Sequence, residues 1–367
     1  MIGVVGATGA VGAAAVRQLA AWGYPVRAGG RSRVRLERLA AAAGPELAVR
    51  PVDVEDPAGL ADFCAGCQAV VNCAGPSVVV LDRVARAAAA AGADYVDAAG
   101  DERLATMLRA APASAPGACV LSAGMTPGLS GLLPRYLAGE GFDQVHRLIA
   151  HHGGRDRFTP AGAADYLAEV DGGGGEPGGV WRDGAVLPRA LAAEAGARLP
   201  FFPEPAAVRP YLAPETVRLA RDLRLAEARW YNVFAGERTL DALERARSLA
   251  DPARAVAELV RAAELDVFGR APYQIFVLEL AGAQGGAPVT RTLVVRGGEA
   301  STLTGVTAAM AAAAVVAGEC PPGVHYAAEV LDAAAAVRRL HKSEALAAFA
   351  VLVGPAAGAL DAEDGAL

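Results

Sequence analysis

The sequence predicts an α/β protein with an N-terminal doubly wound parallel sheet and an inserted α+β domain that contains a mainly antiparallel sheet. The first 125 residues alternate short apolar runs with alanine-rich segments of helical period, and this alternation is typical of a parallel sheet with helices on both faces. After residue 126 the apolar runs are longer and hairpin-like turns separate them, which favours antiparallel pairing.

The elements of the first domain follow from this alternation. Short apolar runs predict strands, and segments with apolar residues three and four positions apart predict the helices between them. The predicted strands are Ile2–Val5, Pro25–Ala28, Leu47–Val52, Ala69–Asn72, Asp94–Asp97 and Ala118–Ser122. The predicted helices are Val11–Trp22, Ser32–Ala43, Pro57–Cys64, Val79–Ala91 and Glu102–Ala110.

The rest of the chain is predicted to form the second domain and then to return to the first. We expect residues 1–125 to form the first domain, 126–305 the insert, 306–353 C-terminal helices that return to the first domain, and 354–367 a disordered tail. The predicted strands of the insert are Val145–His152, Val180–Trp181, Trp230–Ala235, Tyr273–Ala281 and Thr290–Gly297. The predicted helices are Leu129–Leu137, Pro252–Leu265, Gly305–Ala317 and Ala327–Leu340.

The composition narrows the possible classes of function. Of the 367 residues, 53% are hydrophobic and 20% charged, which supplies a core and excludes wholesale disorder. A net charge of −6 without a basic patch argues against a nucleic-acid partner. No apolar run approaches the roughly 20 residues of a membrane helix, and a strand-like run directly after Met1 leaves no room for a secretory leader. We therefore expect a cytoplasmic protein without membrane contact.

The cysteine and histidine patterns predict no metal site. Cys64 and Cys67 form one C-x-x-C at the end of a predicted helix, with no second pair to complete a zinc site. His151 and His152 are adjacent in a predicted strand, so their side chains point to opposite faces and do not easily share one ion.

The strongest local signal is a glycine motif directly after the first predicted strand. Gly6-Ala-Thr-Gly9-Ala-Val-Gly12 has the spacing G-x-x-G-x-x-G and opens the first predicted helix. Glycines there permit a tight turn and let the backbone approach a pyrophosphate, and the helix N-terminus offers free N–H groups. The motif predicts a Rossmann dinucleotide site, with a tight structural turn as the alternative. The candidate cofactor contacts are Gly6, Thr8, Gly9, Ala10, Val11 and Gly12.

The end of the second predicted strand indicates which dinucleotide binds. An enzyme that selects NAD places Asp or Glu there to bind the ribose hydroxyls. This chain has Arg31, Ser32 and Arg33, and guanidinium groups pair well with a 2′-phosphate. NADP(H) is therefore the expected cofactor. The alternative is a solvated helix face, which we prefer for Arg35.

Two further segments follow predicted strands at the edge where open α/β sheets bind ligands. Asp53, next to Val54, is placed either to reach the adenine edge or to cap the following turn. Cys73 lies either near the hydride-transfer region or inside the fold as a small buried thiol. The additional candidate cofactor contacts are Asp53, Val54, Cys73, Ala74, Gly75 and Pro76.

Several motifs resemble, in order and spacing, those of the saccharopine dehydrogenase-like reductases. They are Gly6-Ala-Thr-Gly9, Ala28-Gly29-Gly30-Arg31, Asn72-Cys73-Ala74-Gly75-Pro76, Asp94-Tyr95-Val96-Asp97 with Gly100-Asp101, and Gly124-Met125-Thr126-Pro127-Gly128. The resemblance covers about the first 130 residues and is loose in the middle of the chain. It implies an NAD(P)-dependent oxidoreductase that transfers hydride between a Rossmann domain and a substrate domain, without fixing the substrate. It also makes Met125 and Thr126 candidate substrate contacts.

Candidates for the group that meets the charge left by hydride transfer come from both domains. Tyr95 and Asp97 share a face at the carboxyl end of the fifth predicted strand. His152 ends the first strand of the insert, and Tyr166 follows it. Arg155 and Arg157 are candidate anchors for a substrate carboxylate. The alternatives are histidines that are ordinary sheet residues and a proton that comes from solvent.

The near absence of lysine excludes one family of mechanisms. Lys342 is the only lysine and the residue four before it is Arg338, so the Tyr-x-x-x-Lys group of short-chain dehydrogenases is absent. The use of arginine in place of lysine, with abundant alanine, is typical of a GC-rich genome and compatible with a role in specialised metabolism.

These observations lead to three hypotheses of function. The first is an NADP(H)-dependent oxidoreductase that reduces a C=N or C=C bond of a small metabolite, acting as a homodimer. The second is a trans-acting enoyl reductase on a carrier-bound acyl chain, for which the apolar segment Leu199–Pro203 can supply a cleft mouth, although it can equally be core or a dimer contact. The third is a non-catalytic NADP(H)-binding regulator.

Overall fold

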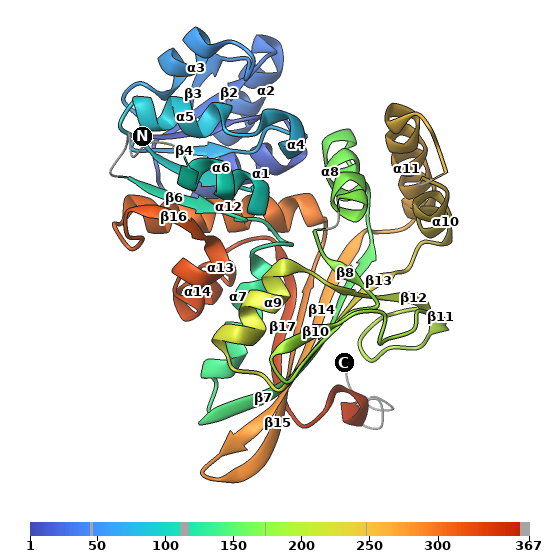
Figure 1. Cartoon of the computed structure of the whole chain (residues 1–367). Coiled ribbons are helices and arrows are strands. Elements are labelled where there is room, and N and C mark those ends of the chain that lie inside the picture. The colour runs from blue at the N-terminus through green and yellow to red at the C-terminus, as the bar shows by residue number, and fades with distance from the viewer. Residues whose placement is uncertain (45–46, 111–116, 173, 247, 360–367) are drawn as a thin grey trace. The chain divides into compact units, whose positions relative to one another are not determined.

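The computed structural model describes residues 1–44, 47–110, 117–172, 174–246 and 248–359, which fold into two compact units (Figure 1). The first unit comprises Met1–Leu132 and Ser301–Ala345, and the second comprises Leu133–Ala300 and Leu346–Leu367. The chain therefore leaves the first unit, builds most of the second, returns, and ends in the second. Residues 360–367 of the predicted tail lie outside the described residues.

The first unit contains a parallel sheet of seven strands in the order β16-β6-β5-β4-β1-β2-β3. Every pairing in it is parallel, and the order reverses between β1 and β4, as in a doubly wound Rossmann fold. The predicted fold class is thus confirmed for this unit. The strands are β1 Ile2–Val5, β2 Val26–Gly30, β3 Ala48–Pro51, β4 Ala69–Asn72, β5 Asp94–Asp97, β6 Ala118–Leu121 and β16 Gly323–Tyr326.

Helices cover the parallel sheet, and their small residues permit close packing (Figure 1). A Cβ on Gly305 of α12 would lie 2.6 Å from the Cβ of Ala14 in α1, so glycine is needed for the close approach of these two helices. On α3, α5 and α6, Phe63, Val84 and Leu104 belong to one buried cluster with strand residues. The helices are α1 Ala10–Ala21, α2 Arg33–Ala43, α3 Pro57–Cys64, α4 Ser77–Val80, α5 Arg83–Ala90, α6 Glu102–Ala110, α12 Ala300–Val316, α13 Ala327–Val330 and α14 Ala333–Leu340.

The second unit contains a ten-stranded sheet with the path β10-β9-β13-β7-β14-β15-β17, and β12, β11 and β8 extend it from β13. The pairing of β13 with β7 is parallel, whereas the other pairings are antiparallel, so the prediction of a mainly antiparallel sheet is confirmed. The strands are β7 Gln144–Arg155, β8 Glu176–Pro177, β9 Val180–Arg182, β10 Ala185–Leu187, β11 Glu194–Ala197, β12 Ala206–Leu212, β13 Glu227–Phe234, β14 Tyr273–Gln284, β15 Ala287–Gly297 and β17 Leu346–Val353.

Two small buried clusters stabilise the second unit. Ala163 of α8, Ala242 of α10 and Leu259 of α11 meet in a small buried cluster. Phe202, which lies in the apolar segment between β11 and β12, packs with Val233, Ile275 and Val277 in another cluster. Of the alternatives for Leu199–Pro203, the structure therefore supports core. The helices are α7 Leu129–Gly139, α8 Pro160–Asp171, α9 Pro214–Asp222, α10 Glu237–Ala246 and α11 Pro252–Val267, and the 3-10 helix Ala356–Ala359 follows β17.

Three predictions of secondary structure need correction. Residues 306–353 are not all helical, because Leu346–Val353 forms β17, which pairs with β15. The predicted helix Val79–Ala91 is two helices, α4 and α5, interrupted at Leu81, whose φ is +50°. The predicted helix Ala327–Leu340 is also divided, because Leu331 is extended and Asp332 caps the separate helix α14.

No helix among the described residues is long and apolar enough to span a lipid bilayer.

Candidate cofactor site and its surroundings

The glycine motif forms a tight turn between β1 and α1. Gly6 has a φ of +78°, and a Cβ there would lie 2.6 Å from the backbone nitrogen of Ala74. A Cβ on Gly12 would overlap the carbonyl oxygen of Gly6. The first and third glycines are thus required by backbone contacts, one with the turn after β4 and one within the loop itself.

The N-terminus of α1 carries no side-chain cap. Gly9 is the N-cap residue and no acidic side chain lies in the first turn. The first N–H groups of a helix have no partner within the helix, and the helix dipole adds positive potential at that end. This end of α1 therefore offers Ala10, Val11 and Gly12 as backbone donors for an anionic group.

Two arginines at the end of β2 lie on the surface. Arg31 and Arg33 are exposed. Within the described residues Arg31 makes no hydrogen bond or ion pair, and Arg33 reaches Glu37 only at 3.9 Å. Ser32 caps α2 by accepting a hydrogen bond from the backbone N–H of Arg35 at 3.4 Å. Guanidinium charge is therefore present at the strand end where an NAD enzyme would carry an acid.

Arg35 is not simply a solvated residue of the α2 surface, as the sequence analysis expected, because its side chain contacts the glycine turn. Its Nη2 donates a hydrogen bond to the carbonyl oxygen of Thr8 at 2.8 Å, so it ties α2 to the glycine turn. Thr8 also packs over Gly30, where a Cβ would lie 3.2 Å from its Oγ1. No pattern in the sequence indicates this contact, because it depends on the reach of one long side chain.

Asp53 caps the turn that follows β3, which is one of the two roles that the sequence suggested for it. Its Oδ1 accepts a hydrogen bond from the N–H of Glu55 at 3.1 Å, and Asp56 caps α3 in turn. Asp53 is exposed and Val54 is half-buried, directly beyond β3.

A buried polar network joins the ends of β4 and β5. Asp97 is only 2% exposed, and its Oδ2 accepts hydrogen bonds from Asn72 Nδ2 at 3.1 Å and from the Tyr95 hydroxyl at 2.5 Å. Its Oδ1 accepts from the N–H of Ala99 at 2.9 Å. Because Asn72 donates with its nitrogen, its Oδ1 is directed to accept from the N–H of Ala74 at 3.1 Å. The structure thus brings Tyr95 and Asp97 together and connects them to the turn that contacts Gly6.

Burial controls the ionisation of the groups around this network. The pKa of Tyr95 lies well above its usual value, first because of burial and then because of the Asp97 charge and hydrogen bond. Burial, with Asp97 second, also raises the pKa of the Cys73 thiol and brings that of Cys119 to about 12. The tyrosine and both thiols are therefore protonated at neutral pH.

The Gly124–Gly128 segment forms a compact turn after β6. Met125 is buried, and its N–H donates to Thr304 Oγ1 at 3.2 Å, whereas Thr126 is exposed. The N–H of Gly124 donates to the carbonyl oxygen of Pro127 at 3.1 Å. Of the two candidate substrate contacts, only Thr126 presents its side chain to solvent.

The two histidines of β7 lie on opposite faces of the second sheet, inside a strand that continues to Arg155. His152 is stacked on Phe276 with a centroid distance of 4.1 Å, and His151 is stacked on Tyr231 at 4.8 Å. Burial lowers the pKa of His152 to about 3 and that of His151 to about 4. Nε2 of His152 is buried and has no hydrogen-bond partner among the described residues. Both imidazoles are neutral at physiological pH.

The candidate substrate arginines of the second unit are paired with carboxylates. Arg155 is buried and forms an ion pair with Glu204. Arg157 donates to Glu299 at 2.9 Å. Tyr166 packs edge-on against Phe158 at a centroid distance of 5.6 Å. These residues are held by neighbours within the second unit.

Within the described residues, no cluster of three or more His, Cys, Asp or Glu side chains is arranged to hold a metal ion. Cys64 and Cys67, the C-x-x-C pair, are buried, and burial raises the pKa of Cys64 to about 11, with Cys67 as the second cause.

Comparison with known families finds a match for the N-terminal part of the chain. Residues 2–120 match the family model described as the saccharopine dehydrogenase NADP binding domain. This segment is a saccharopine dehydrogenase-type NADP-binding domain. The match confirms the family resemblance and the NADP-type cofactor expected from the sequence.

Solved structures extend the similarity in fold beyond this domain. Saccharopine dehydrogenase (L-Glu forming) from Saccharomyces cerevisiae matches over 96% of this chain and 99% of its own, with a TM-score of 0.68 and 15% identity. Serine dehydrogenase from Escherichia coli matches 27% of this chain and 62% of its own, with 22% identity and a TM-score of 0.25. Triphenylmethane reductase from Citrobacter sp. matches 28% of this chain and 38% of its own, with 26% identity and a TM-score of 0.25. No curated protein matches this chain in sequence.

The residues of the NADP-binding domain fit the cofactor that the family implies. Side chains at Gly6 and Gly12 would collide with backbone, the first turn of α1 has no cap, and Arg31 has no partner within the described residues. These features suit a pyrophosphate near the glycine turn and a 2′-phosphate near Arg31.

Proposed function

We propose that the chain is an NADP(H)-dependent oxidoreductase that reduces a C=N or C=C bond of a small metabolite, in specialised metabolism. The observation that carries this proposal is the absence of any partner within the described residues for exposed Arg31, at the end of the strand that follows the glycine turn. Bound NADPH supplies the hydride in such reactions. The saccharopine dehydrogenase-type domain supports the class of reaction.

In this proposal the residues of the first unit bind and orient the cofactor. The N–H groups of the first turn of α1 bind the pyrophosphate, and Arg31, Ser32 and Arg33 bind the 2′-phosphate. Asp53 and Val54 border the adenine. The turn Cys73–Pro76 borders the ribose and nicotinamide.

Asp97 and Tyr95 act in the proposal as positioning residues. The carboxylate of Asp97 holds the Asn72 amide in the orientation that binds the N–H of Ala74, and the hydroxyl of Tyr95 holds the carboxylate. Because Ala74 contacts Gly6, this network maintains the shape of the turn that the glycine motif needs.

The proton required after hydride transfer comes from solvent in this proposal. His152 is neutral above a pH of about 3, since burial lowers its pKa to that value, so it does not serve as an imidazolium acid near neutral pH. Within the second unit, Arg157 is the more exposed of the two candidate anchors for a substrate carboxylate.

Titration of the purified chain with NADPH and NADH tests the proposal. The wild type is expected to bind NADPH at least about 10-fold more tightly, because a charged hydrogen bond contributes about 1.5–3 kcal/mol. Arg31→Ala is expected to weaken NADPH binding and to leave NADH binding unchanged. Arg38→Ala is the matched control, since Arg38 is exposed on the same helix, α2.

Each other outcome of the titration has a definite meaning. Equal affinity for the two cofactors contradicts the 2′-phosphate role of Arg31, and no binding of either contradicts the whole proposal. Turnover of NADPH with imine or enoyl compounds then separates an enzyme from a regulator, which binds both cofactor forms without turnover. A preference for carrier-bound over free enoyl compounds would favour the trans-acting reductase.

A further inference from the structure

The C-x-x-C pair of the first unit, Cys64 and Cys67, takes no part in the proposed cofactor site. Both thiols are free and buried, and both belong to the hydrophobic cluster that contains Phe63. Cys64 is the last residue of α3, and Cys67 lies just before β4. The turn Cys73–Pro76 follows β4, so the two cysteines and the proposed cofactor turn lie at opposite edges of the parallel sheet.

The backbone between the two cysteines forms a tight turn that brings them together. The N–H of Cys67 donates to the carbonyl oxygen of Cys64 at 3.0 Å. Ala65 has a φ of −55° and a ψ of 124°, and Gly66 has a φ of +75°, as in a type II turn. The first and last Cα atoms of such a turn are less than about 7 Å apart, and a disulfide joins Cα atoms about 4.4–6.8 Å apart. The turn therefore permits a bond between the two sulfur atoms with little movement of the backbone.

A guanidinium group lies beside one of the two thiols. Nη1 of Arg27 donates to the carbonyl oxygen of Phe63 at 2.5 Å and to that of Ala65 at 2.8 Å, at the end of α3. The same nitrogen lies 3.6 Å from the sulfur of Cys67. Arg27 thus fixes the backbone of the turn and directs a positive charge at Cys67.

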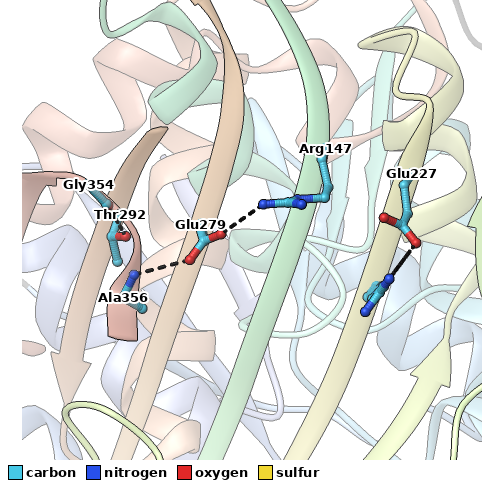
Figure 2. A network of polar contacts seen from close by, with 7 residues as sticks. Arg147, Glu227, Glu279, Thr292, Gly354 and Ala356 are labelled. Atoms are coloured by element: carbon cyan, nitrogen blue, oxygen red, sulfur yellow. Dashed lines mark hydrogen bonds and ion pairs between the residues drawn. The ribbon is translucent and has the colours of Figure 1, made fainter. Parts of the chain in front are cut away.

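The charge of Arg27 is not neutralised by a carboxylate. In the second unit, Arg147 donates to Glu279 at 3.4 Å, and the other oxygen of Glu279 accepts from the N–H of Ala356 at 3.1 Å (Figure 2). Arg27 makes no such ion pair with any of the residues that the structure describes. A cation beside a thiol favours the thiolate, which is the form that reacts with oxidants. The charge of Arg27 is therefore available to a thiolate at Cys67.

The two thiols differ in their access to solvent. Cys67 is 7% exposed and follows the exposed turn residues Ala65 and Gly66, whereas Cys64 is 0% exposed. Burial raises the pKa of both thiols, that of Cys64 to about 11, and the charge of Arg27 opposes the rise. Cys67 is therefore the thiol that a small oxidant meets first, and Cys64 lies behind it.

We propose that Cys64 and Cys67 are a redox-reactive pair that hydrogen peroxide converts into an intramolecular disulfide. The Cys67 thiolate attacks one peroxide oxygen and becomes a sulfenic acid, and the hydroxide that leaves takes up the proton that Cys67 gave to solvent. The Cys64 thiol then attacks the Cys67 sulfur, the S–O bond breaks, and the hydroxyl group leaves with the Cys64 proton as water. Each sulfur loses one electron, and these two electrons reduce the peroxide to water. A reducing thiol reverses the bond by exchange.

Oxidation of the folded, full-length chain with hydrogen peroxide tests the pair. After removal of the peroxide, N-ethylmaleimide in denaturant labels the remaining thiols, and intact-mass spectrometry counts them. The wild type is expected to lose two of its five thiols and, apart from the labels, about 2 Da of mass, and dithiothreitol is expected to restore all five. Cys320→Ser is the matched control, because Cys320 is 8% exposed, close to the value of Cys67. It is expected to lose the same two thiols as the wild type.

Two single variants test the order of the two steps. Cys64→Ser removes the second thiol, so Cys67 is expected to stop at the sulfenic acid, which dimedone labels. Cys67→Ser leaves only the fully buried thiol, and Cys64 is expected to remain reduced and without a dimedone label. Far-UV circular dichroism reports whether each variant is folded. None of these measurements uses NADPH, so a failure of the cofactor proposal does not affect the result.

Several results would overturn the proposal. A wild type that keeps all five thiols in peroxide contradicts it, as does a disulfide that still forms in folded Cys64→Ser or Cys67→Ser. A loss of thiols that requires a high protein concentration would indicate bonds between chains and contradicts it too. If a single variant fails to fold, fragmentation of the oxidised wild type decides the question, because a bond between Cys64 and Cys67 leaves Cys73 labelled by N-ethylmaleimide.

Discussion

At the end of β2, Arg31 is exposed and has no partner among the described residues, whereas Arg155, Arg157 and Arg182 in the second unit pair with Glu204, Glu299 and Glu227. These four arginines thus have different surroundings. A guanidinium without a protein partner is available to an anionic ligand, and one in an ion pair must first exchange its carboxylate. This difference explains why the cofactor is easier to infer than the substrate.

The largest expected effect concerns the paired arginines of the second unit. Arg155→Ala is expected to lower the free energy of unfolding by about 3 kcal/mol, because within the described residues it leaves Glu204 with only Tyr273 and Arg270 as partners. Arg157→Ala removes a more exposed ion pair and is expected to cost less than about 1 kcal/mol. Urea unfolding measures both variants. Equal losses would show that burial does not distinguish these two pairs.

The glycine turn allows a test of cofactor binding by the first unit. Gly6→Ala is expected to weaken NADPH binding about 100-fold, or about 2.8 kcal/mol, because the new Cβ would displace the Ala74 turn. Gly23→Ala is the matched control: Gly23 has a φ of +80°, close to that of Gly6, but a Cβ there meets nothing within 4 Å. Fluorescence titration with NADPH compares them. Similar affinities for the two variants would mean that the contact with Ala74 is not needed for binding.

The network around Asp97 is the exception within the first unit, because it is fully internal. Tyr95→Phe removes one donor from a buried carboxylate and is expected to cost about 1–3 kcal/mol of unfolding free energy. Tyr24→Phe serves as control, since Tyr24 is half-buried in the same unit and its hydroxyl makes no hydrogen bond within the described residues. If both variants unfold alike in urea, the Tyr95 hydroxyl does not stabilise the network.

Between about pH 7.5 and about pH 5.5, His152 of β7 predicts the smallest effect, a loss of about 1.4 kcal/mol of stability in mild acid. Burial lowers the pKa of His152 from 6.5 to about 3. Between these two pH values the imidazole is protonated in the unfolded chain and neutral in the folded chain. The stabilisation is complete above the unfolded pKa and is lost at about 1.4 kcal/mol per pH unit as the pH falls from 6.5 towards 3. His151 acts in the same direction down to a pH of about 4.

His152→Leu is expected to remove its share of this pH dependence. Unfolding free energies at about pH 7.5 and about pH 5.5 measure the change, and His146→Leu, at an exposed position of the same strand, is the control. A His152→Leu variant that keeps the acid sensitivity of the wild type would place the responsible groups elsewhere.

The parallel sheet could be predicted from the sequence because local patterns suffice for it. Helix and strand periods alternate strictly up to Leu121, and glycine spacing marks the turn at Gly6. The second unit lacks such regularity. β12 contains Pro210, which argues against a strand, and β17 is an uncharged, alanine-rich run that resembles a helix. Both strands are specified by partners far away in the sequence.

The same division holds within the candidate site. Residue types and spacing predicted the tight turn at Gly6 and the position of Arg31 at the end of β2, because these depend on backbone. The contact of Arg35 with Thr8 and the orientation of Asn72 by Asp97 join residues 27 and 25 positions apart. No sequence period relates such pairs, since each depends on side-chain reach in the folded state.

The interleaved order of the two units has a consequence for biosynthesis. The parallel sheet receives its edge strand β16 only when Tyr326 has been synthesised, and the second sheet receives β17 only when Val353 has been synthesised. A ribosome-bound chain of 300 residues would therefore carry two unfinished sheets with open edges. Completion of both folds waits until Val353 has been synthesised, and the nascent chain is most prone to aggregation immediately before that stage.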